Sequence, residues 1–247
     1  MANWNDPRPT GTGFGASPSL SGVSARGEVF DAGLRRHMLS IYNYMASGVM
    51  LSGVVALLFA NSEIGRQIMS SPLRWVIMLA PLGFIFTMNF NRSESTLKTM
   101  FWAFCVIMGM SMSTIFLVYT GASIATTFFA TAGAFAGLSL YGYTTKRNLS
   151  AMGAFMAMGL IGIIIAMVIN LFLQSSGLAL AISVLGVLIF AGLTAWDTQR
   201  LKNDYIYGYA SQGGDIAERA AITGALSLYL NFINLFTLLL QLLGQKE

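Results

Sequence analysis

Five long stretches of this chain contain no aspartate, glutamate, lysine or arginine. They are His37–Ser62, Trp75–Asn91, Thr99–Thr145, Asn148–Trp196 and Ala220–Gln245. An uncharged apolar stretch of about 18 or more residues is typical of a membrane-spanning helix, because a helix satisfies its own backbone hydrogen bonds where water is absent. The pattern therefore predicts an all-α membrane protein embedded in the lipid bilayer.

Two of these stretches are too long to be single helices. At about 1.5 Å per residue, Thr99–Thr145 would form a helix of roughly 70 Å, against a hydrocarbon thickness of about 30 Å. We expect this stretch to break at Thr120–Ser123, where Gly121 can leave the helix and Ser123 can cap the next one. Asn148–Trp196 offers a similar break at residues 174–177. Seven transmembrane helices are therefore predicted, near residues 38–60, 73–91, 99–119, 123–144, 150–173, 178–198 and 218–243.

The distribution of charge predicts an orientation in the membrane. Only 10% of the residues are charged and 55% are apolar, whereas soluble domains carry roughly 25% charged residues. Eleven of the fourteen basic residues fall on the side of the N-terminus: Arg8, Arg26, Arg35, Arg36, Arg92, Lys98, Lys146, Arg147, Arg200, Lys202 and Arg219. The positive-inside rule then predicts a cytoplasmic N-terminus and a C-terminus outside, and it explains the net charge of +4 without nucleic-acid binding.

The N-terminal region differs in composition from the rest of the chain. Residues 1–33 are rich in Gly, Pro and Ser and poor in apolar residues, so a disordered cytoplasmic tail is expected there. Residues 34–247 form the seven-helix domain. The first apolar stretch is too long and too far from the start for a secretory signal, so it is expected to remain as an anchor. Arg35, Arg36 and His37 precede it and can touch anionic headgroups.

Polar residues inside the predicted spans are the candidates for function, because they are costly in lipid and usually face a cavity or a partner helix. The last span has one stripe of them, spaced four, four, three and seven residues apart: Thr223, Ser227, Asn231, Asn234 and Gln241. This stripe places the last helix inside the bundle. Either it lines a watery path, or it only makes interhelical hydrogen bonds.

Asp197 stands at the predicted end of the sixth span, after almost fifty residues without a charge. It is either a carboxylate at headgroup level neutralised by Arg200, or a titrating gate at the cytoplasmic mouth of a cavity. The charged residues that follow are predicted to lie in a loop between the sixth and seventh spans: Lys202, Asp204, Asp215, Glu218 and Arg219. They are ordinary solvated charges, an outer vestibule, or a substitute partner for Asp197.

Three segments resemble the Bax inhibitor-1 family, also called transmembrane Bax inhibitor motif proteins. They are Tyr141–Arg147, Phe190–Arg200 and Ala225–Phe236, in the family's order. The resemblance covers roughly residues 30–245 and is nearest to the bacterial branch. It implies a seven-helix fold in the bacterial inner membrane, with the last helix at the centre and the other six around it.

The resemblance also implies a function, a pH-sensitive leak of calcium down its gradient. The family's gate is a pair of aspartates on the sixth and seventh helices, joined to a basic residue in the closed state. The first aspartate matches Asp197, the second falls on Asn231, and Arg200 is the candidate counter-charge. Two carboxylates in contact share a proton, whereas Asn231 cannot titrate. Asn148 also stands where many members have aspartate, and we interpret it as a helix N-cap.

A calcium site made of Asp197, Asn231 and Asn234 would bind weakly, because calcium favours several oxygen ligands and usually more than one carboxylate. No resident cofactor is expected, and calcium or protons are the expected permeants. Catalysis is not expected either, since the chain has one histidine, His37, and no nucleophile elbow or phosphate loop. The alternative is a regulator without transport that acts on a membrane-bound quality-control protease, as the resemblance implies for some bacterial relatives. The sequence leaves the oligomeric state open.

Overall fold

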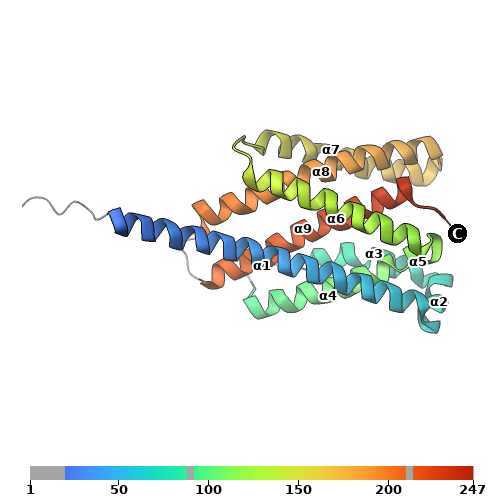
Figure 1. The fold of residues 1–247 in the computed structure, drawn as a ribbon. Coiled ribbons are helices and arrows are strands. Elements are labelled where there is room, and N and C mark those ends of the chain that lie inside the picture. Colours follow the sequence, from blue (N-terminus) through green and yellow to red (C-terminus); the bar gives the residue numbers. More distant parts are fainter. Residues whose placement is uncertain (1–19, 88–91, 210–213, 247) are drawn as a thin grey trace, which may run out of the picture.

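A computed structural model describes residues 20–87, 92–209 and 214–246, and within them the secondary structure is helical. The helices are α1 (Leu20–Asn61), α2 (Glu63–Ser70), α3 (Leu73–Ile85), α4 (Glu94–Met112), α5 (Ile115–Val118), α6 (Gly121–Thr144), α7 (Ser150–Leu173), α8 (Ser176–Tyr207) and α9 (Gly214–Leu243). Figure 1 shows the long helices running side by side in one bundle.

Six spans in the described residues are long and apolar enough to cross a membrane. They lie in α1, α4 with α5, α6, α7, α8 and α9. A seventh is reached when α2 and α3 are taken together, and these two helices meet at a bend of 96°. The seven predicted spans are confirmed in this sense, but the second is shorter than predicted. Helix α3 has 13 residues, includes Pro81 and ends at Ile85, and residues 88–91 lie outside the described residues.

The two predicted breaks are present, with different capping from that expected. The hydroxyl of Thr120 accepts a hydrogen bond from the Ser123 backbone N–H, so Thr120 is the N-cap of α6 and Gly121 is its first residue. The prediction of Ser123 as the cap was wrong by one turn. At the second break Gln174 adopts a left-handed conformation with φ 49°, and Ser175 caps α8. A residue in the left-handed conformation ends a helix and changes the direction of the chain, so a new helix can start directly after it.

Helix α8 extends nine residues beyond its predicted end and α9 begins four residues before its predicted start, and this changes the setting of the charged residues. Helix α8 continues to Tyr207 and α9 begins at Gly214, so Lys202, Asp204 and Asp215 are helical residues. Their prediction as loop residues was wrong. Asp197 lies ten residues before the end of α8, well inside the helix.

Helix α9 is the central helix, as predicted, but the other six spans do not all pack on it. It packs on α1, α4, α6 and α8, while α3 packs mainly on α4 and α7 mainly on α8. Its core side chains include Tyr229, which is fully buried and makes edge-to-face ring contacts with Phe101 and Phe104 of α4. The Tyr229 hydroxyl also lies 2.6 Å from the Ser52 hydroxyl of α1. The centre of the bundle is therefore aromatic on one side of α9.

Small residues bring helix backbones close together at specific points. A Cβ atom added to Gly109 of α4 would lie 2.7 Å from the Ser52 carbonyl oxygen of α1. A Cβ atom on Gly142 of α6 would lie 2.1 Å from the Ala195 carbonyl oxygen of α8. By contrast, a Cβ atom on Gly133 or Gly137 would have nothing within 4 Å. The spacing of small residues marks close packing in α1 and α4, but not along that part of α6.

One end of the bundle is basic. At this end α4 and α9 begin and α6 and α8 end, and α1 projects past the other helices (Figure 1). We call it the basic end, after Arg35, Arg36, Arg92, Lys98, Lys146, Arg147, Lys202 and Arg219. Helix α1 begins at Leu20, within the predicted tail of residues 1–33, and residues 1–19 lie outside the described residues.

Candidate functional site

Asp197 is a buried carboxylate in the interface between α8 and α9. Its exposed fraction is 4%, and the residues on either side of it, Trp196 and Thr198, are a part-buried aromatic and a fully buried hydroxyl. The close backbone approach of Gly142 to Ala195, two residues before Asp197, holds α6 against the same stretch of α8. A buried charge is costly unless it is paired, so the partners of Asp197 define this site.

Two neutral side chains of α9 donate hydrogen bonds to the same oxygen of Asp197. The Asn231 amide donates to Oδ2 at 2.7 Å and the Ser227 hydroxyl donates to Oδ2 at 2.9 Å. Both residues belong to the predicted polar stripe and are spaced four apart, which places them on one face of α9. The predicted pairing of Asp197 with Asn231 is therefore present in the structure.

Arg200 supplies the opposite charge. Its Nη2 atom lies 2.8 Å from Oδ1 of Asp197, one turn along α8. The N–H bonds are not aligned with this oxygen, so no hydrogen bond from the described residues reaches Oδ1. Arg200 also donates weakly to the Ser227 hydroxyl at 3.4 Å and stacks over Trp196, 4.7 Å from the ring centroid. The charges are paired by proximity, and Ser227 and Trp196 also contact the guanidinium group.

A cavity of about 910 Å³ leads from the basic end toward this carboxylate. Arg200 and Ser227, both in contact with Asp197, line it, together with Ile85 and Phe86 at the end of α3. The ionisable side chains along its wall are His37, Arg200, Asp204, Tyr209 and Arg219. Asp197 itself does not line the cavity, but two of its partners, Arg200 and Ser227, do.

The rest of the polar stripe has other partners. Asn234 donates its amide to the Leu230 carbonyl of its own helix, and no hydrogen bond in the described residues joins it to Asp197. Gln241 accepts a hydrogen bond from Ser183 of α8 at 3.0 Å, far from Asp197 along the helices. Thr223 donates to the Arg219 carbonyl and lines the cavity. The stripe thus combines interhelical hydrogen bonding with a cavity wall.

Gln199 is an additional structural residue next to the site. Its Oε1 atom accepts from the Leu149 backbone N–H and its Nε2 atom donates to the Arg147 carbonyl, both at 2.8 Å. These bonds fasten the connection between α6 and α7 to α8. Asn148 lies in that connection, and its side chain accepts from the Ser150 backbone N–H at the start of α7. The N-cap of α7 is Leu149, so the prediction of Asn148 as the N-cap was wrong by one residue, and Asn148 instead closes the turn that leads into the helix.

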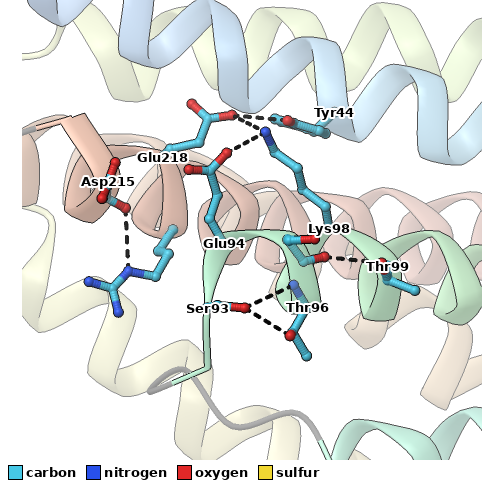
Figure 2. A network of polar contacts seen from close by, with 10 residues as sticks. Tyr44, Ser93, Glu94, Thr96, Lys98, Thr99, Asp215 and Glu218 are labelled. Carbon is cyan, nitrogen blue, oxygen red and sulfur yellow. Dashed lines mark hydrogen bonds and ion pairs between the residues drawn. The ribbon is translucent and has the colours of Figure 1, made fainter.

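The opposite side of α9 is held by a second polar network, drawn in Figure 2. The Tyr44 hydroxyl of α1 donates to Glu218 of α9 at 2.9 Å. Lys98 of α4 lies 3.4 Å from Glu218 and 2.5 Å from Glu94. The basic end of α9 is therefore attached to α1 and α4 as well as to α8.

The donor set of the site limits what it can bind. In the described residues no group of three or more His, Cys, Asp or Glu side chains is arranged to hold a metal ion. Asp197 brings one carboxylate and Asn231 one amide oxygen, which is a weak set for calcium. The site therefore offers one carboxylate, two neutral hydrogen-bond donors and one guanidinium group.

Comparisons with known proteins extend over nearly the whole chain. A protein of Rickettsia prowazekii designated RP147 is 44% identical over 229 residues, covering 91% of this chain and 96% of its own. A Caulobacter vibrioides protein is 46% identical over 231 residues, covering 87% and 90%. The inner membrane protein YbhL of Escherichia coli is 40% identical over 223 residues, covering 87% and 94%.

The match to a protein family covers all the residues that form the site. The model of the family described as "Inhibitor of apoptosis-promoting Bax1" matches residues 34–247. This match includes all the helices that surround Asp197, and it begins one residue after the predicted tail. The chain is therefore an all-α membrane protein that belongs to the Bax inhibitor-1 family.

Proposed function

We propose that this protein is a pH-sensitive cation leak of the bacterial inner membrane, with calcium as a permeant ion and Asp197 at the gate. The observation that carries the proposal is the single buried carboxylate between α8 and the central helix α9, paired with Arg200 at 2.8 Å. The cavity from the basic end supplies the approach to it. The inner membrane is proposed because YbhL, 40% identical, carries that description.

Protonation of Asp197 is the proposed opening event. While ionised, Asp197 attracts Arg200 and accepts two hydrogen bonds from α9, so α8 and α9 are held together. A protonated carboxyl group loses the ion pair and becomes a weaker acceptor for Ser227 and Asn231. Arg200 can then turn into the cavity, away from the path between the helices. We therefore expect flux to rise as the pH falls.

Asn231 makes the proposed gate weakly binding toward calcium. The pair of Asp197 and Asn231 carries at most one negative charge, whereas two aspartates carry up to two. Conduction requires that an ion leave the site as readily as it enters, so weak binding is compatible with a leak. The basic end faces the cytoplasm in this proposal, in accord with the positive-inside rule.

Calcium flux into liposomes tests the proposal. The purified full chain is reconstituted, and flux is measured from pH 5 to 8 for the native protein, for Asp197→Asn and for Asp215→Asn. Asp215 is an exposed carboxylate at the start of α9 and serves as a matched control. The proposal expects the pH dependence to disappear in Asp197→Asn and to persist in Asp215→Asn. A pH dependence that survives in Asp197→Asn excludes this gate.

Absence of flux above that of empty liposomes would favour a regulator that does not transport. The feature consistent with such a role is the projection of α1 beyond the bundle at the basic end, where another membrane protein can reach it (Figure 1). The corresponding partner is a membrane-bound quality-control protease. Its activity on a membrane substrate, measured in liposomes with and without this protein, would then change while calcium flux stayed at background.

A further inference from the structure

A groove of about 620 Å³ lies along the outer face of α1 at the basic end, away from Asp197. The residues that matter in it are Arg35, Arg36, Ser40, Asn43 and Tyr44 of α1, and Trp102 of α4. Arg35 and Arg36 are exposed at its outer end, and Asn43 is exposed further along the helix. No carboxylate contributes to its lining.

Asn43 is an exposed polar side chain at the depth of the membrane boundary. It lies eight residues after Arg35, so the two are about 12 Å apart along the helix axis. Arg35 and Arg36 lie near the start of the apolar span of α1, where arginines reach the headgroups, and this places Asn43 near the boundary between headgroups and acyl chains. A polar side chain at this depth is costly unless it has a hydrogen-bond partner. The partner must come from outside the helices that flank the groove.

Five side chains of the groove carry hydrogen-bond donors without partners among the described residues, whereas the Tyr44 and Ser47 hydroxyls, which also line it, are bonded within the protein. In the part of the chain that the structure describes, the side chains of Arg35, Arg36, Ser40 and Asn43 make no hydrogen bond or ion pair, and neither does the Trp102 indole N–H. Each of these groups can donate, and the two guanidinium groups only donate. The groove is therefore a cluster of unpaired donors with two positive charges, which complements an anion that carries several acceptor oxygens.

We propose that this groove binds the headgroup of an anionic phospholipid. The phosphodiester group lies against Arg35 and Arg36, where guanidinium groups offer paired N–H donors to its oxygens. The ester carbonyls, a few ångströms deeper, accept from Asn43 and from the Trp102 indole. The charge of the headgroup complements the two arginines, and the aromatic residue stands at the depth where tryptophan is favoured in membranes.

The charged groups behind the groove do not compete with this ligand. Tyr44 separates the groove from the network of Figure 2, and its hydroxyl is directed to Glu218. Glu94 and Glu218 of that network are paired with Lys98. A lipid bound in the groove therefore contacts hydrogen-bond donors and no carboxylate of the described residues. It also contacts Tyr44, whose hydroxyl is bonded to Glu218 of the central helix. The groove is in this way connected to α9 by one side chain.

Native mass spectrometry of the full chain in detergent, titrated with phosphatidylglycerol or phosphatidylcholine, tests the proposal. We expect the native protein to bind phosphatidylglycerol at least tenfold more tightly than phosphatidylcholine. Removing both charges in Arg35→Gln/Arg36→Gln is expected to weaken phosphatidylglycerol binding about 30-fold. The matched control is Arg66→Gln/Arg74→Gln, which removes two charges at the opposite end, where Arg74 also stacks on a tryptophan, Trp75. It is expected to change binding less than about twofold.

Asn43→Leu distinguishes a built site from general attraction to a basic surface. Leucine suits a lipid-exposed helix position, so the variant is expected to fold, as its melting temperature will show. Loss of a donor to the ester carbonyls is expected to weaken the binding of both phosphatidylglycerol and phosphatidylcholine severalfold. The ratio of their two affinities should stay unchanged. An unchanged affinity in Asn43→Leu, or an equal loss in the Arg66/Arg74 control, would overturn the site. Displacement of the lipid by millimolar inorganic phosphate would overturn the lipid as its occupant.

Discussion

The amide group of Asn231 donates a hydrogen bond of 2.7 Å to Oδ2 of Asp197 and so joins the central helix α9 to α8. The pair has one carboxylate and one neutral amide, and Arg200 alone balances its charge. A proton can bind at Asp197 and nowhere else in the pair.

Asn231→Asp would convert this site into a pair of carboxylates about one hydrogen bond apart. Two such groups share a proton and titrate together, because both cannot be ionised at that distance without strong repulsion. We expect calcium flux in liposomes to depend more steeply on pH in this variant. We also expect its melting temperature in detergent to fall at high pH, where both carboxylates are forced to ionise.

Asn234→Asp is the matched control for that experiment. It makes the same change three residues further along α9, at a side chain that bonds only to the Leu230 carbonyl of its own helix. Its flux–pH curve should keep the native steepness. A steeper curve in Asn234→Asp, or a native curve in Asn231→Asp, would contradict the coupling of residue 231 to Asp197.

Arg200→Gln should destabilise the protein and raise the leak at high pH. It leaves the Asp197 carboxylate buried without its counter-charge, which we expect to cost roughly 1–3 kcal/mol because Arg200 is itself partly exposed. Stability measured by thermal unfolding should fall less when the same change is made in an Asp197→Asn background. Arg219→Gln, which lines the same cavity without an ion pair to Asp197, is the control. Equal losses in both backgrounds would show that the two residues are not coupled.

Gln199→Ala should loosen the connection between α6 and α7. The substitution leaves the Leu149 N–H without its acceptor and the Arg147 carbonyl without its donor. Unpaired buried groups of this kind cost about 1–3 kcal/mol each, so a clear drop in melting temperature is expected. Asn203→Ala, at an exposed position one turn further along α8, should leave the melting temperature nearly unchanged. Similar melting temperatures for the two variants would show that Gln199 does not stabilise the connection between α6 and α7.

Gly142→Ala should force α6 away from α8. The added Cβ atom would meet the Ala195 carbonyl oxygen at 2.1 Å, and a helix backbone cannot yield as a flexible side chain does. Overpacking of this kind typically costs about 1–3 kcal/mol. Gly137→Ala on the same helix adds the same methyl group with nothing within 4 Å. We expect a lower melting temperature only for Gly142→Ala, and a native value there would mean that α6 and α8 can separate freely.

Much of the helix pattern was predictable because backbone polar groups in lipid must be hydrogen-bonded within the helix. The predicted range 150–173 agrees with α7, since an uncharged stretch with polar residues at both ends leaves little freedom. The end of α8 was not predictable from the same rule. The run of uncharged residues ends at Trp196, but the helix continues to Tyr207 because residues such as Lys202 and Asp204 are tolerated once the helix leaves the hydrocarbon.

The candidate site was predictable in part. The pairing of Asp197 with Asn231 came from the resemblance, and the structure contains it. Asn234 belongs to the same stripe by spacing, yet three residues turn it about 60° from Asn231, and its amide bonds to its own helix. Ser227 and Asn231 can both bond to one oxygen of Asp197 only at one axial register of α9 against α8. Neither helix specifies that register in its own sequence.

The shortness of α3 has a consequence for the membrane around the protein. Its 13 residues reach about 20 Å, while the hydrocarbon layer is about 30 Å thick. A bilayer accommodates a short span by thinning beside it. The end of α3 contributes Ile85 and Phe86 to the cavity that leads to Asp197. Acyl chain length in the surrounding lipid should therefore act most strongly on this flank, beside the cavity that leads to the buried carboxylate.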